Sequence, residues 1–237
     1  MAECATDPDN LIWVMPAEGS MRHDTVFVIS GGPDVSLSMP DLPSGTPVIA
    51  ADKGIDHALA VGIKIDVAVG DMDSVSTSGL AAVEASGARI VRHPSDKDAT
   101  DLELALDEAA ALDPRRMLVV CGGEGRLDHL LAEVLLLGAD RYAAFEIDAL
   151  LGSTRAHVIR SERVIKGRKG SLVSFLALHG PAEGVVTEGL VYPLASETLS
   201  PGSTRGVSNV FAGSEARVAI ASGVLIALCP PIERNRL

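Results

Sequence analysis

The first half of the chain alternates short, continuous apolar runs with segments of helical period. The apolar runs span residues 26–30, 47–52, 66–71, 88–93 and 116–123, and amphipathic segments follow at 54–62, 78–87, 101–112 and 128–138. Continuous apolar runs indicate strands buried on both faces, and intervening helices indicate a parallel sheet. We therefore expect an α/β domain with a doubly wound, mostly parallel sheet that binds its ligands at the carboxyl ends of the strands.

The helical period disappears after about residue 150. Segments 156–165, 171–179, 184–192, 216–221 and 224–229 are rich in β-branched and apolar residues, and turn sequences such as 166–171 and 200–206 separate them. This pattern predicts an all-β sandwich over residues 151–237, following an α/β domain over residues 21–150. Residues 1–20 contain one apolar stretch, 11–15, which is too short for a secretory signal, so we expect a flexible tail.

The amino-acid composition limits the kinds of partner that this protein can bind. Aromatic residues make up 3% of the chain, so Ala, Val, Leu and Ile must build the core, and the net charge is −12. An acidic protein repels nucleic acid and anionic lipid, and no apolar run reaches the ~20 residues that span a bilayer. Cys4, Cys121 and Cys229 show no CxxC spacing. We expect reduced thiols in a soluble, cytoplasmic protein with no nucleic-acid or membrane partner.

Acidic residues follow the third apolar run. Asp71 and Asp73 lie two residues apart in the loop sequence GDMDS, where their carboxylates can converge on one hard cation. A turn that uses Asp to bond its own backbone explains the same pair, so this motif alone leaves both interpretations open.

A second acidic cluster lies between the fourth apolar run and the next helix. The sequence DKDATDLE contains Asp96, Lys97, Asp98, Thr100 and Asp101. Thr100 with Glu103 forms a capping box, which explains two of its residues. It does not explain three crowded aspartates, because like charges repel unless a cation neutralises them. Metal or substrate binding and simple capping are equally compatible with this segment.

Glycine-rich turns end the first and fifth apolar runs. Gly31 and Gly32 follow one strand, and the sequence GGEGRLDH, residues 122–129, follows the other. Glycines let backbone N–H groups approach a phosphate, and Arg126 offers a planar fork for its oxygens. The sequence contains neither the P-loop motif nor a GxGxxG turn after the first strand. Together, these loops at successive strand ends describe a site for Mg²⁺ and a polyphosphate.

The strings GDMDS, DKDATDLELAL and GGEGRLDH, in this order, resemble those of the thiamine pyrophosphokinase family. GLVYPL (189–194) and GSTRGVSN (202–209) resemble that family's thiamine-domain segments, so the resemblance runs from about Val26 to Leu228. It implies an ATP-binding α/β domain, a C-terminal β-sandwich that binds thiamine, and a homodimer. It also implies transfer of the diphosphate of ATP to the thiamine hydroxyl, with Mg²⁺ as cofactor and AMP as the second product.

The resemblance also implies roles for individual residues. Those expected to bind Mg²⁺ and take part in catalysis are Asp71, Asp73, Asp98 and Asp101, with Arg126 and Asp128 completing the catalytic site. Those expected to contact ATP are Gly31, Gly32, Asp52, Asp96, Lys97, Thr100, Gly123, Gly125 and His129. Ser208 and Asn209 are expected to face thiamine.

Two positions depart from the family pattern. Glu133 stands where Asn is common, and Val210 stands where Glu is usual. Both departures concern the acceptor more than the reaction. A pyrophosphokinase for another alcohol, such as a hydroxymethylpterin, and a non-catalytic nucleotide-binding regulator remain the alternatives. A flat pterin ring needs aromatic stacking partners, which this chain largely lacks.

Overall fold

The computed structural model describes residues 23–32, 42–123 and 125–231. The predicted tail, residues 1–20, lies outside these ranges. Six parallel strands form one part of the main sheet: β1 (Thr25–Ile29), β2 (Val48–Ala51), β3 (Val67–Gly70), β4 (Arg89–Arg92), β5 (Arg116–Cys121) and β6 (Glu146–Leu151). The connecting helices are α1 (Gly54–Ala60), α2 (Thr77–Ser86), α3 (Asp101–Ala110) and α4 (Leu127–Leu137), with a 3₁₀ turn η1 (Asp140–Tyr142) after α4. The five predicted strands and four predicted helices of this half are confirmed, and β6 is a sixth strand that was not predicted.

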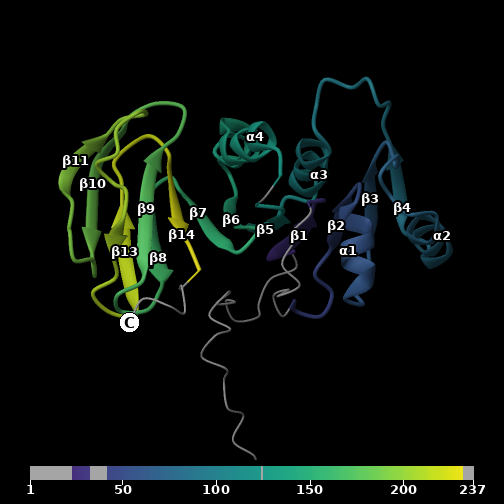
Figure 1. Ribbon diagram of the computed structural model, residues 1–237, viewed down its shortest axis with the longest axis horizontal. Coiled ribbons are helices and arrows are strands. Elements are labelled where there is room, and N and C mark those ends of the chain that lie inside the picture. Colours follow the sequence, from purple (N-terminus) through teal and green to yellow (C-terminus); the bar gives the residue numbers. More distant parts are fainter. Residues whose placement is uncertain (1–22, 33–41, 124, 232–237) are drawn as a thin grey trace, which may run out of the picture.

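The main sheet continues into the second half of the chain. The strand β7 (Thr154–Ile159) pairs antiparallel with β6, and β14 (Leu225–Cys229), β9 (Leu172–Ala177) and β12 (Asn209–Val210) extend the sheet beyond it. The ten strands run in the order β12-β9-β14-β7-β6-β5-β1-β2-β3-β4. The sheet is thus mixed, and no break separates the two predicted domains. Figure 1 shows the β-rich half at the left and the helical half at the right.

A second, antiparallel sheet completes the sandwich. Its strands are β8 (Glu162–Lys166), β10 (Ala182–Glu188), β11 (Ala195–Leu199) and β13 (Glu215–Ala219), in the order β11-β10-β13-β8. Phe175, Phe211, Val185 and Val218 are buried in the core between the two sheets. The sandwich is confirmed, although sequence periodicity missed β11 and β12, since these strands carry too few apolar residues to show an alternation.

Two apolar cores cover the two faces of the parallel strands. One contains Val28 and Val119 of the sheet with Leu106 of α3 and Leu137 of α4. The other contains Phe27 and Leu118 with residues of α1 and α2. None of the described helices has both the length and the apolar character needed to cross a membrane.

A buried ion network joins the two halves. Asp148 of β6 is fully buried and accepts hydrogen bonds from His157 Nδ1 at 2.7 Å, from Arg163 Nη2 at 2.8 Å and from Arg116. Burial alone would raise the pKa of Asp148, but the bond from His157 and the charges of Arg163 and Arg116 outweigh it and lower that pKa. These partners come from β5, β7 and β8, so the carboxylate ties the parallel sheet to the sandwich.

Asp148→Asn should therefore destabilise the fold by about 3–5 kcal/mol, because it leaves two arginines near a buried site without their counter-charge. Urea unfolding at pH 7 measures the change. The control is Asp140→Asn, whose side chain is 94% exposed in its pair with Arg160 and should contribute less than about 1 kcal/mol. Equal, small effects of the two variants would contradict a structural role for the network.

Because the folded protein lowers the pKa of Asp148, the stability that this carboxylate provides depends on pH in one direction. The stabilisation from Asp148 is present above its unfolded pKa of about 4 and is lost as pH falls through the lower folded value. The difference in unfolding free energy between the wild type and Asp148→Asn should thus shrink as pH falls below about 4, which urea unfolding at acidic pH measures.

Candidate functional site

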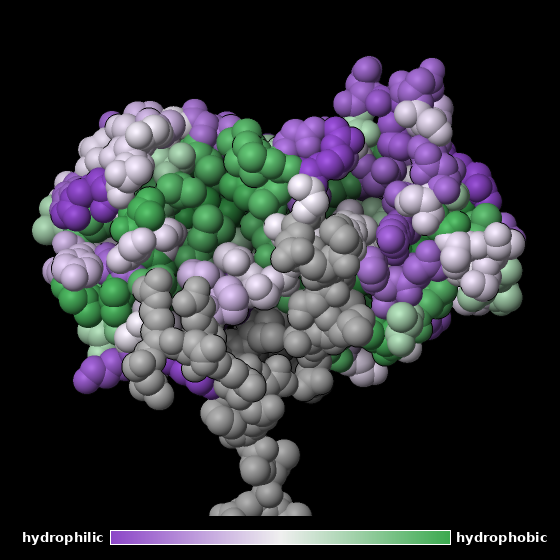
Figure 2. Space-filling model, viewed as in Figure 1, coloured by the Kyte–Doolittle hydropathy of each residue, from purple (hydrophilic) through white to green (hydrophobic). Residues whose placement is uncertain are grey.

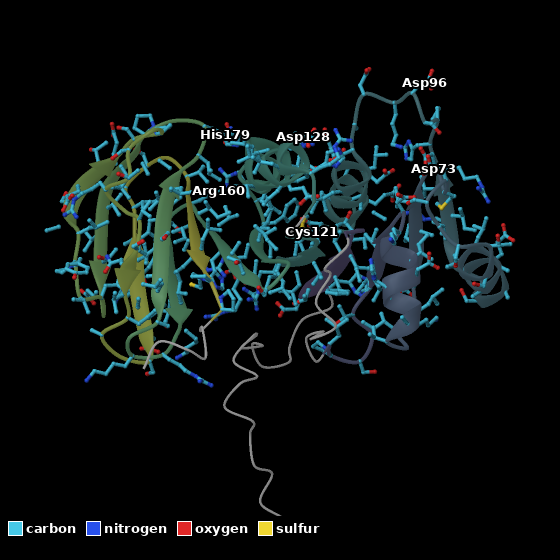
Figure 3. All side chains as sticks on the ribbon, in the orientation of Figure 1. Asp73, Asp96, Cys121, Asp128, Arg160 and His179 are labelled. Carbon is cyan, nitrogen blue, oxygen red and sulfur yellow. The ribbon has the colours of Figure 1, made fainter. Side chains whose placement is uncertain are left out.

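Three carboxylates meet where β2 and β3 end. Oxygen atoms of Asp52, Asp71 and Asp73 lie within 4.8 Å of one another. Asp52 directly follows β2, and Asp71 and Asp73 follow β3, so neighbouring parallel strands deliver all three to one edge of the sheet. Figure 3 shows Asp73 at this edge, beside β3 and below the loop that carries Asp96.

The backbone of both loops is adapted to this convergence. Asp52 adopts φ 48°, a left-handed conformation, and Gly70 adopts φ 135°. A Cβ atom at Gly70 would lie 3.0 Å from Asp101 Oδ1 and 3.5 Å from the Asp52 nitrogen. Glycine at position 70 therefore lets the start of α3 and the end of β2 approach the end of β3.

Lys97 provides positive charge at this site. Its Nζ lies 3.0 Å from Asp101 Oδ1 and 3.5 Å from Asp71 Oδ2, and its side chain is only 13% exposed. Burial opposes the charged form of Lys97, but these carboxylates outweigh it and raise its pKa. Thr100 caps α3 by accepting the Glu103 N–H at 3.3 Å, which confirms the predicted cap. The other half of the capping box is replaced, because the Glu103 carboxylate pairs with Arg141 at 2.6 Å.

The carboxylates perturb one another. The backbone N–H of Asp73 donates to Asp71 Oδ1 at 3.1 Å, and this bond is the main cause that lowers the pKa of Asp71. The pKa of Asp73 is raised, chiefly by repulsion from Asp71 and also by Asp52. Asp71 therefore loses its proton more readily than an isolated aspartate, whereas Asp73 keeps its proton more readily.

The donor set suits a hard divalent cation. Carboxylate oxygens are the ligands that Mg²⁺ prefers, and Asp52 Oδ1 is buried without a hydrogen-bond partner among the described residues. Asp52 Oδ2 accepts from the Ser74 hydroxyl, which orients the carboxylate. A buried, unsatisfied anionic oxygen beside two further carboxylates is the arrangement that a cation would complete.

A cleft of about 620 Å³ opens beside the three carboxylates. Its polar end is lined by residues that follow β1, β2 and β3 and by the start of α3, namely Ser30, Gly31, Gly32, Asp52, Lys53, Ser74, Thr100 and Asp101. Its other end is lined mostly by α4 and is largely apolar, with Ala132, Glu133, Leu135, Leu136, Ala139, His129 and His179. The volume and the change from polar to apolar suit a ligand that carries both phosphates and a ring.

The structure distributes the predicted site residues between the cleft and the surface. Gly31, Gly32, Asp52, Thr100, Asp101 and His129 line the cleft, and Asp71, Asp73 and Lys97 lie in or against the acidic group. Asp96 and Asp98 are exposed and lie outside that group. Arg126 and Asp128 pair with each other at 2.6 Å on the surface, and Gly123 and Gly125 do not line the cleft.

Asp52 was expected to contact the nucleotide, but it lies in the acidic group. No site role was predicted for Lys53, Ser74 or Glu133, which line the cleft. The position of Lys53 directly after the second apolar run was the available signal. His179 gave none, because it reaches the cleft from the end of β9 through contact with α4, where its Nε2 donates to the Leu135 carbonyl at 2.8 Å.

Ser208 and Asn209 lie at the far edge of the main sheet. Asn209 is buried, its Nδ2 donates to the Tyr192 carbonyl at 2.6 Å, and its Oδ1 accepts the Tyr192 N–H at 3.1 Å. Ser208 is exposed and adopts φ 60°, so it, rather than Asn209, takes the left-handed position of the turn. The bonds of Asn209 hold segments 189–194 and 202–209 together and leave Val191, Tyr192, Val207 and Ser208 exposed.

Comparison with known proteins gives consistent results for both halves. Residues 43–147 match the family model described as the thiamin pyrophosphokinase catalytic domain, and residues 156–225 match the thiamin pyrophosphokinase vitamin B1 binding domain. A thiamine pyrophosphokinase of Bacillus subtilis (strain 168) is 27% identical over 208 residues, covering 85% of this chain and 96% of the relative. A thiamine pyrophosphokinase 1 of Oryza sativa subsp. japonica is 27% identical over 178 residues, covering 68% of this chain and 65% of the relative.

Solved structures share the fold. The crystal structure of thiamine pyrophosphokinase from Bacillus subtilis superimposes with a TM-score of 0.77 at 25% identity, covering 88% of this chain and 100% of the other. That of thiamin pyrophosphokinase from Geobacillus thermodenitrificans gives a TM-score of 0.74 at 24% identity, covering 90% and 100%.

The geometry predicts which aspartates bind a divalent cation. Asp52→Asn, Asp71→Asn and Asp73→Asn should each weaken Mn²⁺ binding by about tenfold or more, because each removes a charged oxygen from the group. Titration followed by electron paramagnetic resonance measures the free Mn²⁺. Asp98→Asn is the matched control, since Asp98 lies in the acidic loop but outside the group. An equal loss in Asp98→Asn would mean that this loop also ligates the cation.

Proposed function

Since the chain belongs to the thiamin pyrophosphokinase family, we propose that its strand-end cleft binds ATP and transfers the diphosphate of ATP to the hydroxyl of thiamine. In this reaction the thiamine oxygen attacks the β-phosphorus, the bond from that phosphorus to the α,β-bridging oxygen breaks, and AMP leaves. The observation that carries the proposal is the continuity of the cleft, which joins a carboxylate group suited to a cation with an apolar end suited to a base.

Several residues are suited to hold the polyphosphate. Gly31 lies so close to Lys53 that a Cβ atom at Gly31 would approach the Lys53 Cβ to 2.8 Å, and both residues line the cleft. The amino end of the ten-residue helix α3 adds backbone N–H groups and a favourable dipole. We expect these groups to orient the phosphates and to stabilise charge that develops during transfer.

The acidic group is the proposed Mg²⁺ site, held by Asp52, Asp71 and Asp73, with Asp101 close by. When bound there, Mg²⁺ would neutralise phosphate oxygens and favour charge build-up on the transferred group. Lys97 occupies the space between Asp71 and Asp101, so it reduces the repulsion among these side chains before any ligand arrives. The proposed roles of Asp98, Arg126 and Asp128 require their loops to move toward the cleft.

Thiamine is proposed to bind beside Ser208, Tyr192 and Val207 in the residues after 151. This surface belongs to β12 and its neighbours, whereas the acidic group lies at β2 and β3. At about 4.8 Å per strand, seven or eight strand spacings separate the two by roughly 35–40 Å along the sheet. Reacting atoms must lie about 3–3.5 Å apart, so one chain cannot bring its own two surfaces together.

A homodimer resolves this separation. In a two-fold dimer, the C-terminal half of one chain can face the cleft of its partner. Leu127, Leu131 and Leu135 form an apolar stripe on α4, with side chains 66%, 55% and 48% exposed. Figure 2 shows apolar surface over the centre of this view, where α4 and the neighbouring strands lie in Figure 1. A second copy of the chain is the proposed partner for this surface.

The two alternative functions are less well supported. A hydroxymethylpterin pyrophosphokinase would share the phosphate chemistry but does not account for a match to the vitamin B1 binding domain. A regulator would share the fold but has no use for three carboxylates held within 4.8 Å of one another. We propose a cytoplasmic location, in keeping with the buried thiols of Cys121 and Cys229.

The function is tested by AMP formation from ATP and Mg²⁺ with thiamine or a hydroxymethylpterin as the acceptor. We expect AMP and thiamine diphosphate in equal amounts with thiamine, and no AMP above background with the pterin. Asp73→Asn is the negative control and should lower turnover by orders of magnitude. AMP formation with the pterin alone would assign the chain to the alternative reaction.

Mixing two inactive variants tests the shared site. Asp73→Asn disables the nucleotide side, and Tyr192→Arg places a positive charge where the cationic thiamine is proposed to bind. A heterodimer of the two has one fully intact site of two, so an equal mixture should regain about one quarter of wild-type activity. If both surfaces acted within one chain, mixing would restore nothing.

A further inference from the structure

Glu133 is a carboxylic acid in an apolar wall. It lies on α4 (Leu127–Leu137) and lines the cleft together with Ala132 and Leu136 of the same helix. Its residue is partly buried, and the neighbouring turns of α4 present leucines and an alanine. In Figure 3, Cys121 lies beneath α4, at the end of β5. Glu133 thus lines the cleft from α4 and also contacts the buried Cys121 beneath the helix.

The described residues give this carboxyl group almost no support as an anion. Burial raises the pKa of Glu133 to about 7, and a hydrogen bond with the Cys121 side chain opposes the rise only in part. No ion pair with Glu133 is formed within the described ranges. At neutral pH a large share of the protein therefore carries Glu133 as a neutral acid.

A neutral carboxylic acid presents an O–H donor next to a C=O acceptor. An amidine edge, in which a ring nitrogen lies next to an exocyclic amino group, presents the complementary acceptor and donor. The adenine of ATP carries this edge at N1 and N6, and the aminopyrimidine of thiamine carries it at N3′ and N4′. Guanine instead presents donors at N1 and N2, which match an ionised carboxylate.

We propose that Glu133 is a specificity-determining residue that binds the amidine edge of a substrate ring inside the cleft. The inference rests on the proposed binding of ATP there. Two hydrogen bonds formed away from water would align the ring against Ala132 and Leu136 and would reject rings that lack the amino group. Because adenine is joined to the phosphates held at the polar end of the same cleft, the adenine edge is the favoured source.

Other titratable groups line the same cleft or contact Glu133. They are His129 on α4, Asp101 and Glu103 on α3, Asp52 and Lys53 between β2 and α1, His179 after β9, and Cys121 at the end of β5. These groups are present both in the wild type and in the variants of position 133. The test is therefore a comparison between variants rather than a pH profile of the wild type alone.

The experiment measures binding by calorimetry at pH 6 and at pH 8 with two probes, α,β-methylene-ATP with Mg²⁺ and thiamine. Wild-type affinity for the recognised probe should fall about fivefold to tenfold from pH 6 to pH 8, because the neutral acid falls to about one tenth of the molecules. Glu133→Gln keeps a donor and an acceptor at every pH, so it should bind as well as the wild type at pH 6 and lose the pH dependence. Glu133→Ala should bind about tenfold more weakly at pH 6. Glu188→Gln, at an exposed position of β10, is the matched control and should behave as the wild type.

Each outcome decides the inference. If Glu133→Gln removes the pH dependence only for α,β-methylene-ATP, Glu133 binds adenine. If it removes the pH dependence only for thiamine, Glu133 binds the aminopyrimidine. Unchanged affinity and pH dependence in both Glu133 variants would overturn the inference. Lys53→Gln separates that failure from a failure of the proposed function, because it should weaken α,β-methylene-ATP whenever the cleft holds the nucleotide.

Discussion

Repulsion among carboxylates at one edge of the parallel sheet is the constraint around which the site is arranged. Asp52, Asp71 and Asp73 are fixed within 4.8 Å of one another by strands whose pairing leaves them no freedom to separate. The protein reduces this repulsion locally, through Lys97 and the Asp73 backbone N–H, but leaves Asp52 Oδ1 without a partner in the described chain. The unfavourable negative charge therefore remains at the position where a cation can neutralise it and in turn bind a polyphosphate.

The main sheet sets the second constraint. Since β6 and β7 pair directly, the sandwich cannot swing toward the cleft without breaking the sheet and the buried Asp148 network. This rigidity keeps the proposed thiamine surface near β12 and the acidic group near β2 and β3. In the proposed dimer, a second copy would cover the exposed leucines of α4 and supply the missing surface.

Sequence periodicity was sufficient for much of the fold. Continuous apolar runs identified five of the six parallel strands, β1 to β5, but not β6, and Thr100 marked the start of α3 because a cap depends on residues close in sequence. The acidic group was only partly predictable, since Asp71 and Asp73 are adjacent in a loop whereas Asp52 joins them through strand pairing. The roles of His179 and Asp148 could not be predicted, because both depend on contacts between segments far apart in the chain. The strand β12 was not predicted because it has only two residues, which are too few to show an alternation of apolar and polar positions.

Two chains are proposed to form each reaction site around the strand-end carboxylates. A distance measurement can test this arrangement, with Mn²⁺ bound at the acidic group and a nitroxide attached at Ser208→Cys in a chain whose Cys4 is replaced by Ser. Pulsed electron paramagnetic resonance should give one long distance, up to roughly 40 Å, within each chain, and a second, far shorter distance to the label of the partner. A single long distance would mean that the surface around Ser208 of the partner does not reach the acidic group.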